Sequence, residues 1–89
     1  MEVPDDVVAD LQKRLRRAEG QVRAVQRMLE EKSECRDLIT QISAASKAID
    51  QVGFRLLACG MAQCAKDPDA AEADGYPMAE IERLFSKLA

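Results

Sequence analysis

Residues 33–65, SECRDLITQISAASKAIDQVGFRLLACGMAQCA, contain no proline and decide the fold. The two glycines of this stretch lie in its interior, and Cys35 and Cys64 lie near its ends. Small and apolar residues recur every three or four positions, which is the spacing of one helix face. This stripe consists of Cys35, Ile39, Ile42, Ser46, Ile49, Gly53, Leu56, Leu57, Gly60 and Cys64. The stretch predicts one long helix with Ser33 as its N-cap.

Cys35 and Cys64 cannot meet within one such helix, because a rise of ~1.5 Å per residue separates them by roughly 44 Å. They nevertheless lie on the same face, since the turn of ~100° per residue returns Cys64 to within about 20° of Cys35. Two copies packed antiparallel would place Cys35 of one beside Cys64 of the other, twice by symmetry. The spacing therefore favours a dimer with paired thiol sites, whereas the plainer alternative is that both cysteines are small buried hydrophobic residues.

Two further helices are expected, one before the long helix and one after it. The first helix runs from Pro4 or Asp5 to about Glu31, and the last from Met78 to Lys87, where Ile81, Leu84, Phe85 and Leu88 supply an apolar face. The block 68–76 is acidic and rich in small residues, which indicates a loop. The predicted fold is all-α, with three helices in a single domain spanning 1–89.

The chain has 89 residues, so it buries a limited core alone and oligomerisation would stabilise it. No apolar run is long enough to cross a membrane, and no charged-then-apolar leader is present, so we expect a cytoplasmic protein. Three cysteines in such a protein favour metal or redox chemistry over a disulfide framework.

The net charge of −3 argues weakly against nucleic acid, but the charges are unevenly distributed. Between Leu11 and Leu29 the chain has six basic residues and one acidic residue, Glu19. Projected on a helix, Lys13, Arg16, Arg17, Arg23 and Arg27 occupy an arc of about 120° opposite the apolar face. We call this set the basic arc. Gly20 lies near its middle, where the missing side chain would let a partner approach the backbone; the alternative is a solvated surface.

The residues give little support to an enzyme or a conventional metal motif. Histidine is absent, so no serine, cysteine or lysine has a plausible general base beside it. There is also no CxxC pair and no glycine-rich phosphate loop. Two thiolates suit the soft ion Cu(I), with Met61 as a possible third donor. Cys59 points about 140° away from Cys64, so we expect it to pack in a core or between subunits.

Two segments carry a family resemblance. Residues 14–28, RLRRAEGQVRAVQRM, and residues 35–44, CRDLITQISA, resemble the conserved segments of CsoR/RcnR/FrmR-type repressors, and the likeness continues through Gly53 to Cys64. The resemblance implies an all-α homodimer with an antiparallel four-helix-bundle core that assembles into a flat tetramer. It also implies an operator-binding repressor without a helix-turn-helix, released when an inducer reaches the cysteines.

The cysteine pattern points to one branch of that family. Copper sensors of the family place a histidine between the two cysteines, and here Gly60 occupies that position. Nickel and cobalt sensors need several histidines, and the formaldehyde branch has a proline where this chain has Glu2. Two cysteines without the histidine resemble the persulfide-sensing, CstR-like branch. Tyr76 and Glu80 resemble residues that support the site in copper sensors, which keeps the copper alternative open.

The sequence thus predicts a DNA-binding repressor, not an enzyme, that needs no cofactor and senses persulfide or polysulfide through an intersubunit Cys35–Cys64 pair. The predicted DNA contacts are Lys13, Arg14, Arg16, Arg17, Gln21, Arg23 and Arg27. The alternatives are a Cu(I) sensor using Cys35, Cys64 and Met61 or Cys59, and a helical interaction module without a DNA role. The expected partners are operator DNA, a second copy of the chain and the inducer, with no membrane.

Overall fold

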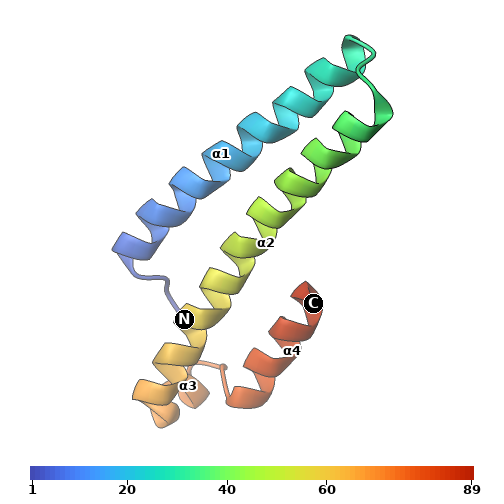
Figure 1. Cartoon of the computed structure of the whole chain (residues 1–89). Helices are drawn as coiled ribbons and strands as arrows, with labels where there is room; N and C mark the ends of the chain where they lie inside the picture. The colour runs from blue at the N-terminus through green and yellow to red at the C-terminus, as the bar shows by residue number, and fades with distance from the viewer. The chain divides into compact units, whose positions relative to one another are not determined.

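The computed structural model describes residues 1–89 and is entirely helical (Figure 1). Its helices are α1 (Asp5–Glu30), α2 (Cys35–Lys66), α3 (Pro68–Ala73) and α4 (Met78–Leu88). The all-α prediction is confirmed, and the bounds of the first, second and last helices lie close to those predicted. None of these helices has both the length and the apolar content needed to cross a membrane.

The prediction of three helices is wrong, because residues 68–73 form α3 where a loop was expected. The Asp67 side chain accepts a hydrogen bond from the Ala70 amide at 3.1 Å and caps this helix, and Pro68 occupies its first turn. Proline and an aspartate cap favour a helix start. Gly75 then takes a left-handed conformation with φ of 86°, which ends the helix within two residues.

The start of α2 also differs from the prediction. The backbone carbonyl of Glu34 accepts from the amides of Asp37 and Leu38, both at 3.1 Å, and its carboxylate accepts from the Arg36 amide at 2.7 Å. Glu34 therefore caps α2 in place of Ser33, whose amide instead donates to the Met28 carbonyl in the turn after α1.

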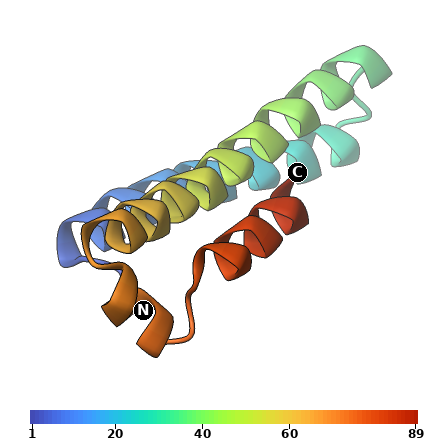
Figure 2. The same cartoon turned by 90° about the horizontal axis from the view of Figure 1, so that it is seen from below.

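The chain divides into two compact units. The first, which we call the hairpin unit, comprises residues 6–52, in which α1 and the first half of α2 lie side by side and antiparallel (Figures 1 and 2). Its buried residues are Val7, Leu11 and Ala18 of α1 with Ala45 and Val52 of α2. The stripe residues Ile39, Ile42 and Ile49 are not part of this contact and remain at least half exposed.

The second unit, which we call the thiol unit, comprises residues 1–5 and 53–89. Leu57, Cys64, Ala71 and Ile81 form its buried cluster, against which Met1, Tyr76 and Leu84 pack. The second half of α2 and α4 lie alongside each other (Figure 2), and the rings of Phe54 and Phe85 are 5.9 Å apart. Gly53 permits this approach, because a Cβ there would lie 2.7 Å from Leu88 Cδ2.

Candidate functional site

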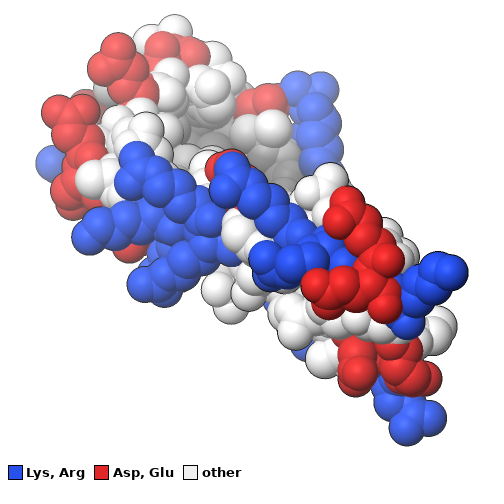
Figure 3. All heavy atoms as spheres, turned by 90° about the horizontal axis from the view of Figure 1, so that it is seen from above, with Lys and Arg blue, Asp and Glu red and all other residues white.

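The predicted DNA contacts lie on α1, and all of them except Gln21 are exposed. Figure 3 shows Lys and Arg side chains gathered along this helix on one face of the molecule. No atom lies within 4 Å of the place where a Cβ at Gly20 would be, so the backbone in the middle of the basic arc is open. The helix therefore presents a cationic surface to which a phosphate backbone can come close.

The cations of α1 differ in whether a carboxylate already neutralises them. Arg14 Nε lies 2.9 Å from Asp10 Oδ2, and Arg23 forms an ion pair with Glu19, each one turn away. The other cations of the set have no carboxylate within 4.0 Å: Lys13, Arg16, Arg17 and Arg27. These four can meet phosphates without first giving up a partner.

Gln21 is placed differently from the cations around it. Its side chain is half-buried, and its Oε1 atom is buried without a hydrogen-bond partner. A buried acceptor left unpaired costs roughly 1–3 kcal/mol, so this side chain gains by turning outward to a donor. The DNA contact predicted for Gln21 requires that rotation and stays a prediction.

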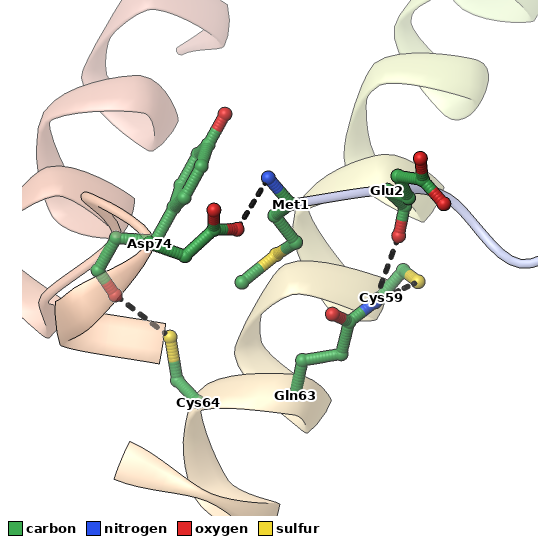
Figure 4. Close-up of polar contacts among 7 residues, drawn as sticks. Met1, Glu2, Cys59, Gln63, Cys64 and Asp74 are labelled. Atoms are coloured by element: carbon green, nitrogen blue, oxygen red, sulfur yellow. Dashed lines mark hydrogen bonds and ion pairs between the residues drawn. The ribbon is translucent and has the colours of Figure 1, made fainter. Parts of the chain in front are cut away.

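The two candidate sensor thiols have unlike surroundings. Cys35 is exposed and is the first residue of α2, next to Arg36. Cys64 is only 5% exposed, and its Sγ donates a hydrogen bond to the Tyr76 carbonyl oxygen at 3.2 Å (Figure 4). All three cysteines are free thiols. Because α2 is one continuous helix of 32 residues, Cys35 and Cys64 of one chain stay roughly 44 Å apart.

Cys59 is buried, as predicted, and its Sγ accepts from Gln63 Nε2 at 3.6 Å. Tyr76 lies beside Cys64, but it is the backbone carbonyl and not the phenol that contacts the thiol. Glu80 is instead bound to Arg83 at 2.7 Å, and the hydrogen bond from this guanidinium lowers the pKa of the Glu80 carboxyl. The structure thus brings one of the two predicted supporting residues to a thiol.

Gly60 is buried where it faces α4. A Cβ there would lie 3.3 Å from Ile81 Cδ1 and 3.7 Å from Met1 Sδ, so the neighbouring side chains already fill the space that a larger residue would need. Met61, the proposed third Cu(I) donor, is half exposed. Within one chain no three Cys, His, Asp or Glu side chains come together to hold a metal ion. Cys35 and Cys64 of the same chain cannot bind one ion together, because α2 holds them far apart.

Comparison with known proteins decides the family. The profile of a family described as "Metal-sensitive transcriptional repressor" matches residues 8–88. The chain belongs to this family. The copper-sensing transcriptional repressor RicR of Mycobacterium tuberculosis is 46% identical over 68 residues, which cover 76% of this chain and 68% of RicR. The copper-sensing transcriptional repressor CsoR of Bacillus subtilis is 35% identical over 75 residues, which cover 84% of this chain and 74% of CsoR.

A solved structure agrees with the family assignment. The copper-sensing repressor CsoR with Cu(I) from Geobacillus thermodenitrificans has a TM-score of 0.71 and 32% identity to this chain, covering 99% of it and 88% of CsoR. The resemblance to CsoR-type repressors is therefore confirmed, and with it a family of transcriptional repressors, not of enzymes. The three relatives are described as copper-sensing, so the assignment to the persulfide-sensing branch is not confirmed by them.

Proposed function

We propose that this chain is a cytoplasmic, operator-binding repressor whose inducer is a reactive sulfur species that cross-links Cys35 of one subunit to Cys64 of another. The observation that carries the proposal is the donor set of α2. Two free thiols lie near its ends, Gly60 occupies the position at which the copper sensors of the family place a histidine, and the whole chain has no histidine. This set suits sulfur exchange between two thiols better than a metal site with three donors.

An intersubunit pair requires an assembly, and the hairpin unit has a surface suited to one. Six of its large apolar side chains are between 43% and 61% exposed: Leu15, Val22, Leu29, Ile39, Ile42 and Ile49. Exposed apolar residues gathered in this way mark interaction sites. We therefore propose that a second copy covers them in an antiparallel four-helix core, and that two such dimers form the flat tetramer of the family.

Placing a charge in this surface should break the assembly. Ile42→Glu should raise the dissociation constant of the dimer at least about a hundredfold, since an unpaired charge buried at an interface costs roughly 3–5 kcal/mol. Analytical ultracentrifugation at micromolar concentration measures this. Ser43→Glu, at the adjacent exposed position, is the control and should leave the assembly intact. A folded wild-type monomer at that concentration would contradict the proposed dimer.

The surroundings of the thiols set the order of the reaction. Exposed Cys35, the first residue of α2, attacks a polysulfide as its thiolate and becomes a persulfide or a longer sulfur chain, while the rest of the polysulfide leaves. Cys64 of the other subunit then gives up its proton and attacks that chain. Attack at Cys35 Sγ expels a hydropolysulfide and forms a disulfide, whereas attack one atom further forms a trisulfide and expels the sulfur atoms beyond it. The added polysulfide is thus the oxidant.

The experiment that tests the function compares the two inducers on the wild-type protein. Operator binding and intact mass are followed after separate exposure to polysulfide and to Cu(I). Sulfur sensing predicts covalent dimers, one or more added sulfur atoms and loss of the operator with polysulfide alone. Release by one Cu(I) per chain in competition with a strong chelator, without covalent dimers under polysulfide, would replace sulfur by copper as the inducer.

The basic arc supplies the DNA-binding half of the proposal, and Glu19 is its one internal competitor. Removing this carboxylate in Glu19→Gln frees Arg23 for a phosphate, so operator affinity should rise by about threefold, in line with the small energy of an exposed ion pair. Fluorescence anisotropy with a labelled operator measures the change. Glu82→Gln, on α4, carries the same change in charge and should have no effect. Unchanged affinity in Glu19→Gln would show that Arg23 does not contact DNA.

The second candidate function is Cu(I) sensing, and the relatives named above favour it because they are described as copper-sensing. Cys35 and Cys64 would supply two donors, with Met61 or Cys59 as a third. On this basis Gly60→His should supply the missing donor and raise the affinity for Cu(I) by more than about tenfold, which corresponds to about 1.4 kcal/mol of binding free energy. It should also make release of the operator depend on copper.

Because Ile81 already lies close to residue 60, the histidine variant should be combined with Ile81→Val to make room. Gly60→Ala with Ile81→Val is the matched control that adds a Cβ without an imidazole. Chelator competition and X-ray absorption report affinity and a nitrogen donor. If wild type and Gly60→His bind Cu(I) equally tightly, position 60 does not face the metal.

A further inference from the structure

The segment formed by residues 1–4, which we call the N-terminal segment, is attached to the thiol unit at three points. The Met1 amine lies 2.5 Å from Asp74 Oδ2. The Met1 side chain is 10% exposed and packs against the buried cluster that contains Cys64. The carbonyl oxygen of Glu2 accepts a hydrogen bond from Gln63 Nε2 at 3.3 Å. Figure 4 shows these contacts around the two buried thiols.

The same residues enclose the thiols. Cys64 belongs to the cluster that Met1 covers, and Met1 Sδ lies 3.7 Å from the place of a Cβ at Gly60, one turn before Cys64 on α2. Gln63, which holds Glu2, also donates to Cys59 Sγ at 3.6 Å. A hollow of about 390 Å³ lies beside this region, and its lining includes Met1, Glu2 and Val3 of the segment and Cys59 and Gly60 of α2. Moving the segment away would therefore open one side of the core that holds both Cys59 and Cys64.

The two polar contacts of this attachment open readily. Asp74 is 54% exposed, so its ion pair is screened by solvent, and the Gln63 hydrogen bond is single and exposed. Beyond Pro4 the chain continues directly into α1, whose first residue is Asp5. The segment is thus held on the buried thiol core by non-covalent contacts and is joined directly, through the backbone, to the helix that has the basic arc.

We propose that the N-terminal segment is a cover for Cys64 that must open before this thiol reacts, and whose opening loosens the first turns of α1. The inference rests on the proposed role of Cys64 as the second sensor thiol. It adds a controlled step, since the exposed Cys35 can react at once, whereas Cys64 reacts only in molecules whose cover has opened. Because the segment continues directly into α1, its movement away from the thiol core also displaces the first turns of this helix.

The test uses the full chain and a small alkylating agent. The double variant Asp74→Asn/Gln63→Ala removes the ion pair and the Glu2 contact, both at exposed or half-buried side chains. Iodoacetamide, whose iodide a thiolate displaces, is added under native conditions and the rate at each cysteine is read by mass spectrometry. The Cys64 rate should rise about tenfold while the Cys35 rate is unchanged. Equal Cys64 rates in the variant and the wild type would overturn the proposal.

The matched control is Glu72→Gln/Gln51→Ala, which makes the same changes of charge and side chain at exposed positions and should leave the Cys64 rate at the wild-type value. Amide hydrogen exchange supplies a second readout. Residues 6–11 should exchange faster in the open variant, while residues 38–48 of α2 should not. Faster exchange in both segments would indicate general loosening and overturn the proposal, as would no change at residues 6–11. Neither measurement uses polysulfide or DNA, so the proposed inducer can fail independently of this inference.

Discussion

The double variant Arg17→Ala/Arg23→Ala should bind the operator at least about a hundredfold more weakly than the wild type at low salt. Hydrogen bonds to charged groups contribute roughly 1.5–3 kcal/mol each, so two lost phosphate contacts suffice for this effect. The slope of log affinity against log salt should also become shallower by about 1.8, because each neutralised phosphate contributes about 0.9 through counterion release. Anisotropy titrations at four salt concentrations measure both quantities.

The structure predicts how the two single variants differ. Arg17 has no carboxylate partner, whereas Arg23 forms an ion pair with Glu19 and must leave it to reach a phosphate. Arg17→Ala should therefore cost more affinity than Arg23→Ala. The control is Arg83→Ala/Lys87→Ala on α4, which removes the same charge and should reduce affinity only slightly through the general field. Equal losses in this control and in the α1 double variant would mean that net charge, and not the basic arc, determines binding.

The helix bounds and the basic arc were predictable because both depend on local geometry. The turn of ~100° per residue projects Lys13, Arg16 and Arg17 onto one side of any regular helix, whatever it packs against. The ion pair between Glu19 and Arg23 is also local, since residues four apart are neighbours on a helix surface. The error at residues 68–73 has a local cause as well. The aspartate, proline and alanine of this segment are as typical of a capped short helix as of a loop.

The surroundings of Cys64 could not be predicted from the sequence, because they depend on residues far apart in the chain. Met1 and Asp74 are brought together by the packing of α3 and of the N-terminal segment on α2. No sequence motif at either residue predicts this contact. The same holds for the Tyr76 carbonyl that accepts the Cys64 hydrogen bond. Periodicity correctly placed both thiols on one helix, but only the packing shows that one is exposed and the other enclosed.

This difference between the thiols bears on the choice between inducers. A metal ion bound by two thiolates needs both deprotonated at once, whereas sulfur exchange uses them one after the other. In this structure Cys35 is accessible, while Cys64 is enclosed and its thiol donates a hydrogen bond to the Tyr76 carbonyl oxygen. The arrangement favours a sequential reaction, in which an exposed thiol captures sulfur and an enclosed thiol completes the bridge. It also determines which cysteine variants should stop the reaction, and at which step.

Cys35→Ala should abolish both the cross-link and operator release under polysulfide, because it removes the thiol that takes the first sulfur atom. Cys64→Ala should still gain sulfur at Cys35 in the intact mass but form no covalent dimer. Cys59→Ala should behave like the wild type, since its thiol is turned away from Cys64 and bound by Gln63. Non-reducing electrophoresis, intact mass and operator anisotropy on the same samples report the three steps. The effect is close to all-or-none, because no other thiol remains that can form the pair.

The length of the bridge adds a quantitative check. A disulfide requires Cα atoms about 4.4–6.8 Å apart, and each inserted sulfur atom lets the bridge span a wider gap between the helix ends. Bridging fixes that gap at both ends of the dimer, and it releases DNA only if the bridged state binds the operator less tightly than the open one. The bridged wild type, separated from free polysulfide, should therefore stay off the operator until a reductant is added. Release of the operator by Cys35→Ala under polysulfide, or a cross-link that maps to Cys59, would show that this mechanism is wrong.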